Sequence, residues 1–112
     1  MPLTPAEAAP QLNTLGCPLQ GQNLICVMEA LIESPTYQSF EGTVRARNIP
    51  HFNWENLFVL PFRTICEHNN AARIKAENML RDSEIVDVFA TTRNIVFTTL
   101  RDWALQKVGR AD

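Results

Sequence analysis

The feature that most constrains the fold is the lack of chain-breaking residues from residue 43 onward. Between Thr43 and Val108 there is no glycine, and only Pro50 and Pro61 interrupt the run. Sheets of short strands need frequent turn residues, and the sequence contains no Asn-Gly or Asp-Gly hairpin signal. The sequence therefore predicts an all-α fold, a compact bundle of about five to six helices with a long C-terminal helix.

The chain is long enough for one hydrophobic core without metal or disulfide support, because it has 112 residues, of which 46% are hydrophobic. We expect a single helical domain over residues 1–112. Residues 1–22 are expected to form a loosely ordered N-terminal arm with one short helix. In this arm Thr4, Pro5 and Glu7 have the spacing of a capping box at a helix start.

Apolar residues at helical spacing predict the next two helices. Asn23 is placed to cap the first of them. Ser34 is placed to cap the second, with Pro35 in its first turn. The expected inward-facing residues are Leu24, Val27, Met28 and Leu31 in the first helix, and Tyr37, Phe40 and Val44 in the second.

The segment 53–68 contains too many apolar residues for a helix with one buried side. We expect a helix that Asn53 caps, that is buried nearly all round, and that Pro61 kinks or splits. A strand over Leu57 to Leu60 is the alternative. An Ala-rich helix follows over 69–82, and its expected inward-facing residues are Ala72, Ala76, Met79 and Leu80.

The last predicted helix runs from Glu84, behind an N-cap at Ser83, to about Val108, with Trp103 facing inward. Its apolar positions repeat every 3.6 residues over about five turns. Aromatic and arginine side chains are enriched at the centres of interfaces. We therefore predict a non-catalytic helical protein–protein interaction or assembly subunit that self-associates through the outer face of this helix. The residues of this outer strip are Arg93, Phe97, Arg101 and Leu105.

The same stretch also resembles the helix-turn-helix regulators over about 17 residues. Residues 85–89 would end the first helix, Ala90 to Thr92 would form the turn, and residues 92–101 would be the recognition helix. The resemblance implies a DNA-binding regulator as the alternative function. The turn usually contains glycine where this chain has Ala90, and Phe97 would face the groove. The base-reading side chains would be Arg93, Asn94, Thr98 and Arg101.

The charge distribution gives no general attraction to polyanions, because the formal net charge is −2. Residues 1–44 contain four acidic and no basic side chains, and residues 45–112 contain ten basic and eight acidic ones. No apolar run approaches the roughly 20 residues that a membrane span needs, and no secretory signal is visible. We expect an intracellular protein with no membrane partner.

Cysteine and histidine could in principle form a metal site or a catalytic pair. Neighbours such as Cys66 and His68 do not share a helix face. Three cysteines, an odd number, indicate free thiols more than a disulfide framework. No phosphate-binding, dinucleotide-binding or nucleophile-elbow motif occurs. We expect a protein that is not an enzyme and that binds no metal or cofactor. A metal site would require the fold to gather Cys17, Cys26, Cys66, His51 and His68. A catalytic cysteine would require it to bring Cys66 beside His51 and Glu67.

Aromatic residues also follow two arginines in the segment 45–58. Such a mixture can stack on single-stranded bases. The interpretation that we favour is a loop that delivers Trp54 and Phe58 into the core, because large aromatic side chains are mostly buried. The residues concerned are Arg45, Arg47, His51, Phe52, Trp54 and Phe58.

Overall fold

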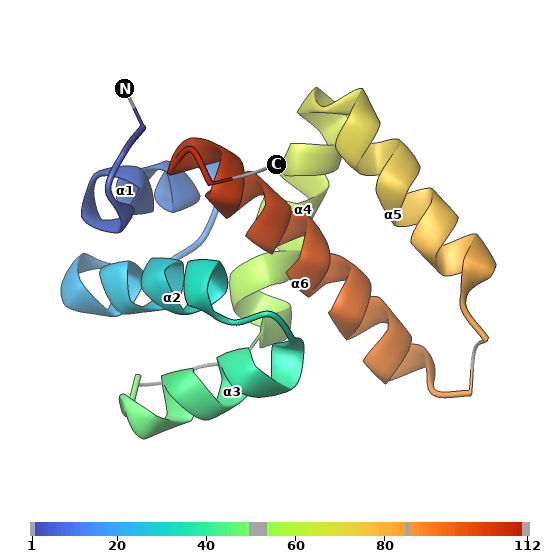
Figure 1. Cartoon of the computed structure of the whole chain (residues 1–112), viewed down its shortest axis with the longest axis horizontal. Helices are drawn as coiled ribbons and strands as arrows, with labels where there is room; N and C mark the ends of the chain where they lie inside the picture. Colours follow the sequence, from blue (N-terminus) through green and yellow to red (C-terminus); the bar gives the residue numbers. More distant parts are fainter. Residues whose placement is uncertain (1, 50–53, 85, 111–112) are drawn as a thin grey trace.

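The computed structural model describes residues 2–49, 54–84 and 86–110 of the chain. Within these ranges it contains six helices and no strand, which confirms the predicted all-α class and the long C-terminal helix. The helices are α1 (Pro5–Leu15), α2 (Gly21–Glu33), α3 (Tyr37–Ala46), α4 (Trp54–His68), α5 (Asn70–Asp82) and α6 (Val88–Lys107), shown in Figure 1.

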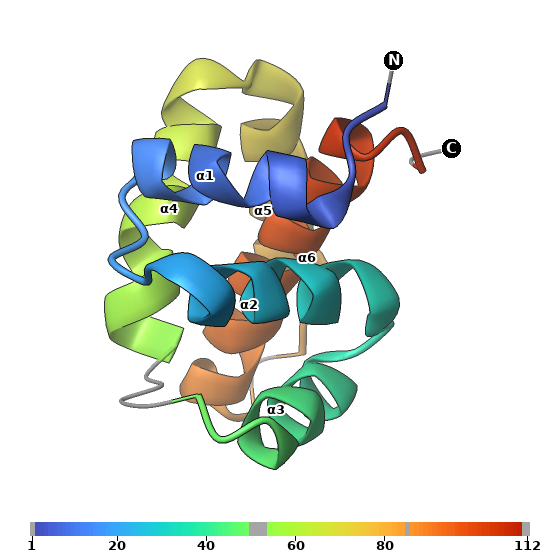
Figure 2. The same cartoon turned by 90° about the vertical axis from the view of Figure 1, so that its left-hand side faces the viewer.

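The long helix α6 lies in the middle of the molecule. It packs against α2, α3, α4 and α5, while α1 packs against α2 and α4. In Figure 2, α1 and α2 lie side by side across one face of the molecule, with α5 behind them. Figure 1 shows α5 on the far side of α6 from α1, α2 and α3. Helix α5 packs mainly against α4 and α6 and lies at the edge of the molecule in Figure 1.

Helix α1 begins with the capping box that the sequence predicts. The Thr4 hydroxyl accepts from the Glu7 N–H at 3.2 Å, and the Glu7 carboxylate accepts from the Thr4 N–H at 2.9 Å. The helix is longer than the expected short one and ends at Gly16, whose φ of 111° is a left-handed cap. Its residues Ala8, Ala9 and Leu12 have no exposed surface. The N-terminal segment thus contributes to the core, since its apolar residues also follow the helical period.

Three of the predicted N-caps are wrong, and one of them, Ser83, ends α5 instead of starting α6. Helix α2 begins at Gly21 behind Gln20, without a side-chain cap, so Asn23 already lies inside the helix. Ser34 ends α2 instead of starting α3, and its N–H donates to the carbonyl oxygen of Ala30 at 3.0 Å. Thr36 caps α3 by accepting from a backbone N–H in its first turn. The inward stripe predicted for α3 is confirmed, because Tyr37, Phe40 and Val44 are all buried.

Helix α4 continues through Pro61, so residues 57–60 are helical and the strand alternative is wrong. Pro61 is itself fully buried, and packing compensates for the backbone hydrogen bond that a proline cannot donate. The helix is not buried all round, because Leu60 is 54% exposed. The cap expected at Asn53 lies outside the described residues.

The α5–α6 hairpin differs from the prediction in two respects. In α5 only Ala76 is buried, and Leu80, expected to face inward, is 50% exposed. Helix α6 begins at Val88, not at Glu84, because the side chain of Asp87 caps it by accepting from the Ala90 N–H at 3.2 Å. Val88 and Phe89, which the periodicity assigned to the inner face of a longer helix, therefore lie in the first turn of α6 and are exposed.

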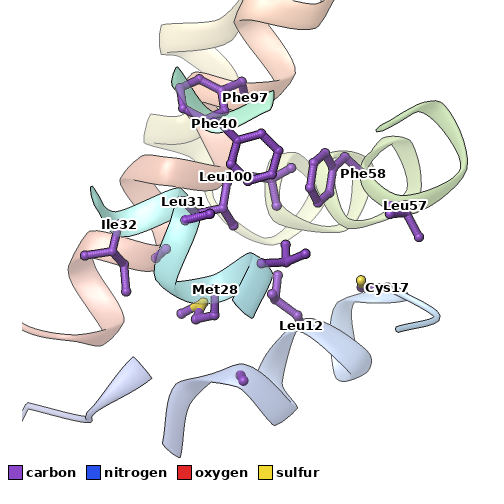
Figure 3. Packing of buried hydrophobic residues seen from close by; sticks show 14 of the residues in the cluster. Leu12, Cys17, Met28, Leu31, Ile32, Phe40, Leu57, Phe58, Phe97 and Leu100 are labelled. Carbon is purple, nitrogen blue, oxygen red and sulfur yellow. The ribbon is translucent and has the colours of Figure 1, made fainter. Parts of the chain in front are cut away.

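The centre of the core is a group of aromatic rings, shown in Figure 3. The ring centroid of Phe40 lies 5.6 Å from that of Phe58 and 5.5 Å from that of Phe97. Tyr37 meets Phe97 edge to face at 6.0 Å. These separations are typical of favourable aromatic pairs. Helices α3, α4 and α6 are therefore held together by direct ring contacts, with aliphatic residues of α1 and α2 beside them.

Candidate interaction surface

The outer strip predicted on the C-terminal helix is not an exposed surface. Phe97 is only 4% exposed, and its ring packs against those of Tyr37 and Phe40. The prediction that Phe97 forms the centre of an exposed interface is therefore wrong. The physical reason is that α3 packs its Tyr37 and Phe40 rings against Phe97, so the predicted outer face of α6 is covered there.

The other members of the strip attach α6 to its neighbours. The guanidinium carbon of Arg93 lies 4.5 Å from the centroid of the Tyr37 ring, a cation–π contact. An Nη of Arg101 donates to the carbonyl oxygen of Ile32 at 3.5 Å. Leu105 is half-buried against the core. The two arginines therefore contact the molecule's own α3 and α2, although the Nε atom of each is buried without a hydrogen-bond partner among the described residues.

The turn of the helix-turn-helix interpretation is not formed. Residues Ala90 to Thr92 lie inside α6, which is uninterrupted from Val88 to Lys107. Of the proposed base-reading residues, Asn94 is exposed and Thr98 is half-buried, and both border a shallow hollow beside Tyr37. The arginines of that set make the contacts with α2 and α3 described above, so the four side chains do not form one exposed row.

The cysteines do not gather with other metal-binding side chains. Cys17 is buried, Cys26 and Cys66 are half-buried, and all three are free. Burial raises the pKa of the Cys17 thiol and that of the Cys66 thiol. No group of three or more possible metal ligands occurs within residues 2–49, 54–84 and 86–110. His51, which the metal and catalytic hypotheses required, lies outside these ranges.

The aromatic residues after Arg45 and Arg47 are only partly described. Phe58 is 1% exposed and lies in the core, and Trp54 is half-buried against it. This agrees with the favoured interpretation that the segment delivers both rings inward. His51 and Phe52 lie outside the described residues. Among the helices that are described, none combines the length and apolar character needed to cross a bilayer.

The surface with the most exposed apolar side chains lies where α5 and α6 are joined. Among the described residues six large hydrophobic side chains are exposed, and four of them fall between residues 80 and 89. Leu80 is 50% exposed, Val86 89%, Val88 66% and Phe89 69%. We name these four residues, with the two hollows beside them, the α5–α6 surface. Single exposed apolar side chains are ordinary, and four within ten residues make this the surface to consider for an interaction.

Two hollows lie on the α5–α6 surface and share Thr92 as a border. The first, of about 240 Å³, lies between α5 and α6 with Phe62 of α4 as part of its lining. The second, of about 350 Å³, lies between α4 and the first turns of α6, and Trp54 and Phe89 line it. The remaining lining residues are Ala76, Glu77, Leu80, Ile95 and Val96 in the first hollow and Val59 and Val88 in the second.

The segment that carries this apolar surface is acidic. Residues 77–92 contain four acidic side chains and one basic one, a net charge of −3. Glu77 is paired with Arg73 at 2.7 Å, and Asp82 lies 3.5 Å from Arg81. Glu84 and Asp87 are exposed and make no ion pair with any described residue. Glu84 and Asp87 are therefore two exposed carboxylates beside the α5–α6 surface without a basic partner among the described residues, although Asp87 also accepts from the Ala90 N–H.

Sequence reasoning missed this surface because the helix start was placed too early. With a helix from residue 84, Val88 and Phe89 fit the inward-facing period. One local signal could have corrected the predicted helix start, because Asp87 is a favourable N-cap residue directly before the apolar residues Val88 and Phe89. A start at Val88 leaves Val86 in a connection, where no helical face can bury it.

Comparison of the chain with protein-family models, with curated proteins and with solved structures finds no match. Function therefore has to be inferred from the shape and chemistry of the surface.

Proposed function

We propose that this protein is a non-catalytic helical interaction module that binds a partner protein through the α5–α6 surface. The observation that carries the proposal is the exposure of Phe89, 69%, beside Val86, Val88 and Leu80. Full burial of one such side chain stabilises a complex by about 1.5–3 kcal/mol. A partner that covers this surface would therefore gain several kcal/mol from apolar contact alone.

The architecture supports a binding role for this surface. Trp54 and Phe62 of α4 line its two hollows, and α4 is anchored in the core through Phe58. A binding surface that rests on packed helices loses little conformational entropy when a partner docks. Aromatic side chains in preformed hollows are also the usual energetic centres of protein interfaces.

Self-association was expected through the outer strip of α6. Phe97, the centre of that strip, is buried, so an interaction through it would require α3 to leave the core. The proposed module therefore uses the opposite side of the α5–α6 hairpin. Partner binding there needs no rearrangement of the helices.

The experiment compares Phe89→Asp with Gln38→Asp. Phe89 and Gln38 are both the second residue of a helix, and both are exposed. The two variants therefore add the same charge at the same place relative to a helix N-terminus, where an acidic residue is tolerated. Only Phe89→Asp removes apolar surface from the hollow lined by Trp54 and Val59.

Immobilised wild-type protein and both variants would be incubated with extract from the source cells, and bound proteins quantified by mass spectrometry. We expect proteins that wild type and Gln38→Asp retain and that Phe89→Asp loses. Circular dichroism should show equal helicity for all three. If every retained protein binds Phe89→Asp as well as wild type, the α5–α6 surface is not the binding site and the proposal is wrong.

A further inference from the structure

We infer, on the basis of the interaction function proposed above, that the α5–α6 surface binds a basic amphipathic helix of a partner protein. The inference joins two properties of this surface. Its centre is apolar and hollowed between helices, and the adjoining segment carries the exposed carboxylates of Glu84 and Asp87, which make no ion pair with a described residue. A helix with an apolar stripe and a polar face rich in Lys or Arg complements both properties.

The shape of the surface favours a helical segment over an extended one. Extended peptides commonly bind by adding a strand to the edge of a sheet, and the described part of the chain contains no strand to extend. The walls here are α5 and α6, with α4 beneath them. Two hollows that share Thr92 can accept two apolar side chains from successive turns of one helix, which lie three or four residues apart.

The charge on the border favours a basic segment. Glu84 and Asp87 are exposed and form no ion pair within the described part of the chain, and Asp82 lies 3.5 Å from the exposed Arg81. Like charges across an interface are unfavourable, and opposite charges raise the rate and specificity of association. The same carboxylates disfavour an anionic membrane or a nucleic acid as the occupant of this surface.

A second copy of the chain is disfavoured for the same reason. In a twofold dimer the same patch meets itself, so the border with Glu84 and Asp87 would face its own copy. This arrangement would place unpaired carboxylates against one another at the edge of an apolar contact. Association of two copies is therefore an outcome that the test must be able to detect.

The test uses two designed peptides of about 18 residues with Leu at the helical spacing i, i+3, i+4 and i+7. One carries Lys at the remaining positions and the other carries Glu, since both residues favour helices equally. Each bears a fluorescent label, and binding to the intact protein is read by fluorescence anisotropy at about 150 mM salt, where long-range attraction is screened. Sedimentation velocity of the protein alone reports self-association.

We expect the Lys-rich peptide to bind at least tenfold more tightly than the Glu-rich one. Phe89→Asp should weaken its binding about 30-fold, the effect of losing one energetic centre. The added negative charge of Phe89→Asp would strengthen nonspecific attraction of a cationic peptide. Weaker binding of the Lys-rich peptide to this variant would therefore be due to the lost apolar contact. Gln38→Asp should leave binding unchanged. Glu84→Lys should reduce the preference for the Lys-rich peptide several-fold.

The opposing outcomes are distinct. Equal binding of both peptides, lost in Phe89→Asp, would overturn the basic partner while leaving the interaction function in place. Binding of neither peptide to the wild-type protein would also overturn the inference, and the extract experiment with Phe89→Asp would then decide the proposed function separately. A dimer that dissociates in Phe89→Asp would show that a second copy occupies the surface.

Discussion

Truncation of Phe97 to alanine is expected to destabilise the fold strongly. The ring is 4% exposed and lies 5.5 Å from the Phe40 ring and 6.0 Å from the Tyr37 ring, centroid to centroid. Tyr37 is also the ring on which Arg93 stacks. Removing Phe97 therefore leaves a cavity at the place where α3 is attached to α6.

The magnitude follows from the burial. Phe→Ala in a packed core costs about 3–5 kcal/mol, because transfer and cavity terms add. This is a large part of the roughly 5–15 kcal/mol by which a domain of this kind is stable. Phe97→Leu retains much of the volume, and we expect it to cost less than about 1.5 kcal/mol. Phe89→Ala is the matched control, and its cost should stay within about 0.5 kcal/mol because Phe89 is 69% exposed.

The free energy of unfolding would be measured by urea titration, with helicity and tryptophan fluorescence recorded on the same samples. Coincident transitions of the two signals would justify a two-state treatment. The expected order of stability is wild type and Phe89→Ala together, then Phe97→Leu, then Phe97→Ala. If Phe97→Ala costs no more than Phe89→Ala, Phe97 is not a core residue, and the assignment of the exposed surface to the other side of α6 is refuted.

Four further predictions concern α1, α2 and the connection between them. Thr4→Ala should cost about 1 kcal/mol in urea unfolding, because it removes the cap of α1. Hydrogen bonds from the backbone and hydroxyl of Thr4 hold the pKa of Glu7 below its ordinary value of 4.5. The stability that the Glu7 carboxylate adds is therefore present above pH 4.5 and is lost as the pH falls through the lower pKa of the folded state. The difference in unfolding free energy between wild type and Glu7→Gln should accordingly shrink on acidification. Gly16→Ala should lower the melting temperature, because a Cβ at φ 111° would meet a side chain of α4 at 2.7 Å, and an unchanged melting temperature would contradict this geometry. A thiol reagent at mildly alkaline pH should modify Cys26 readily in the native protein, whereas Cys17 should react only after unfolding. The reason is that Cys17 is 3% exposed and burial raises the pKa of its thiol. Equal modification rates for the two cysteines would refute the assigned burial.

Local features of the fold could be predicted from the sequence because each depends on residues close together in the chain. The capping box of Thr4 and Glu7 needs only a spacing of three residues. The inward stripe of α3 is set by one helical period, and the long uninterrupted α6 by the absence of glycine and proline. The strand alternative at residues 57–60 stayed open because a short apolar run fits either structure.

The position of the candidate surface could not be predicted, because it depends on which helices cover α6. Arg93, Phe97 and Arg101 at four-residue spacing look like an exposed strip when α6 is considered alone. In the structure α2 and α3 cover that strip, and the arginines pack their stems and guanidinium groups against other residues. The apolar residues that are exposed, those of the α5–α6 surface, owe their exposure to the helix start behind Asp87 and to the α5–α6 hairpin, which projects from the bundle in Figure 1.

The most direct test of the central claim is a titration of isotope-labelled protein with the Lys-rich peptide, followed by the backbone amide resonances. The account predicts that the resonances that shift belong to residues 77–96 and to the face of α4 near Phe62, and that Phe89→Asp abolishes the shifts. Shifts confined to α1, α2 and α3, with residues 80–92 unchanged, would contradict the assignment of the α5–α6 surface as the partner-binding site.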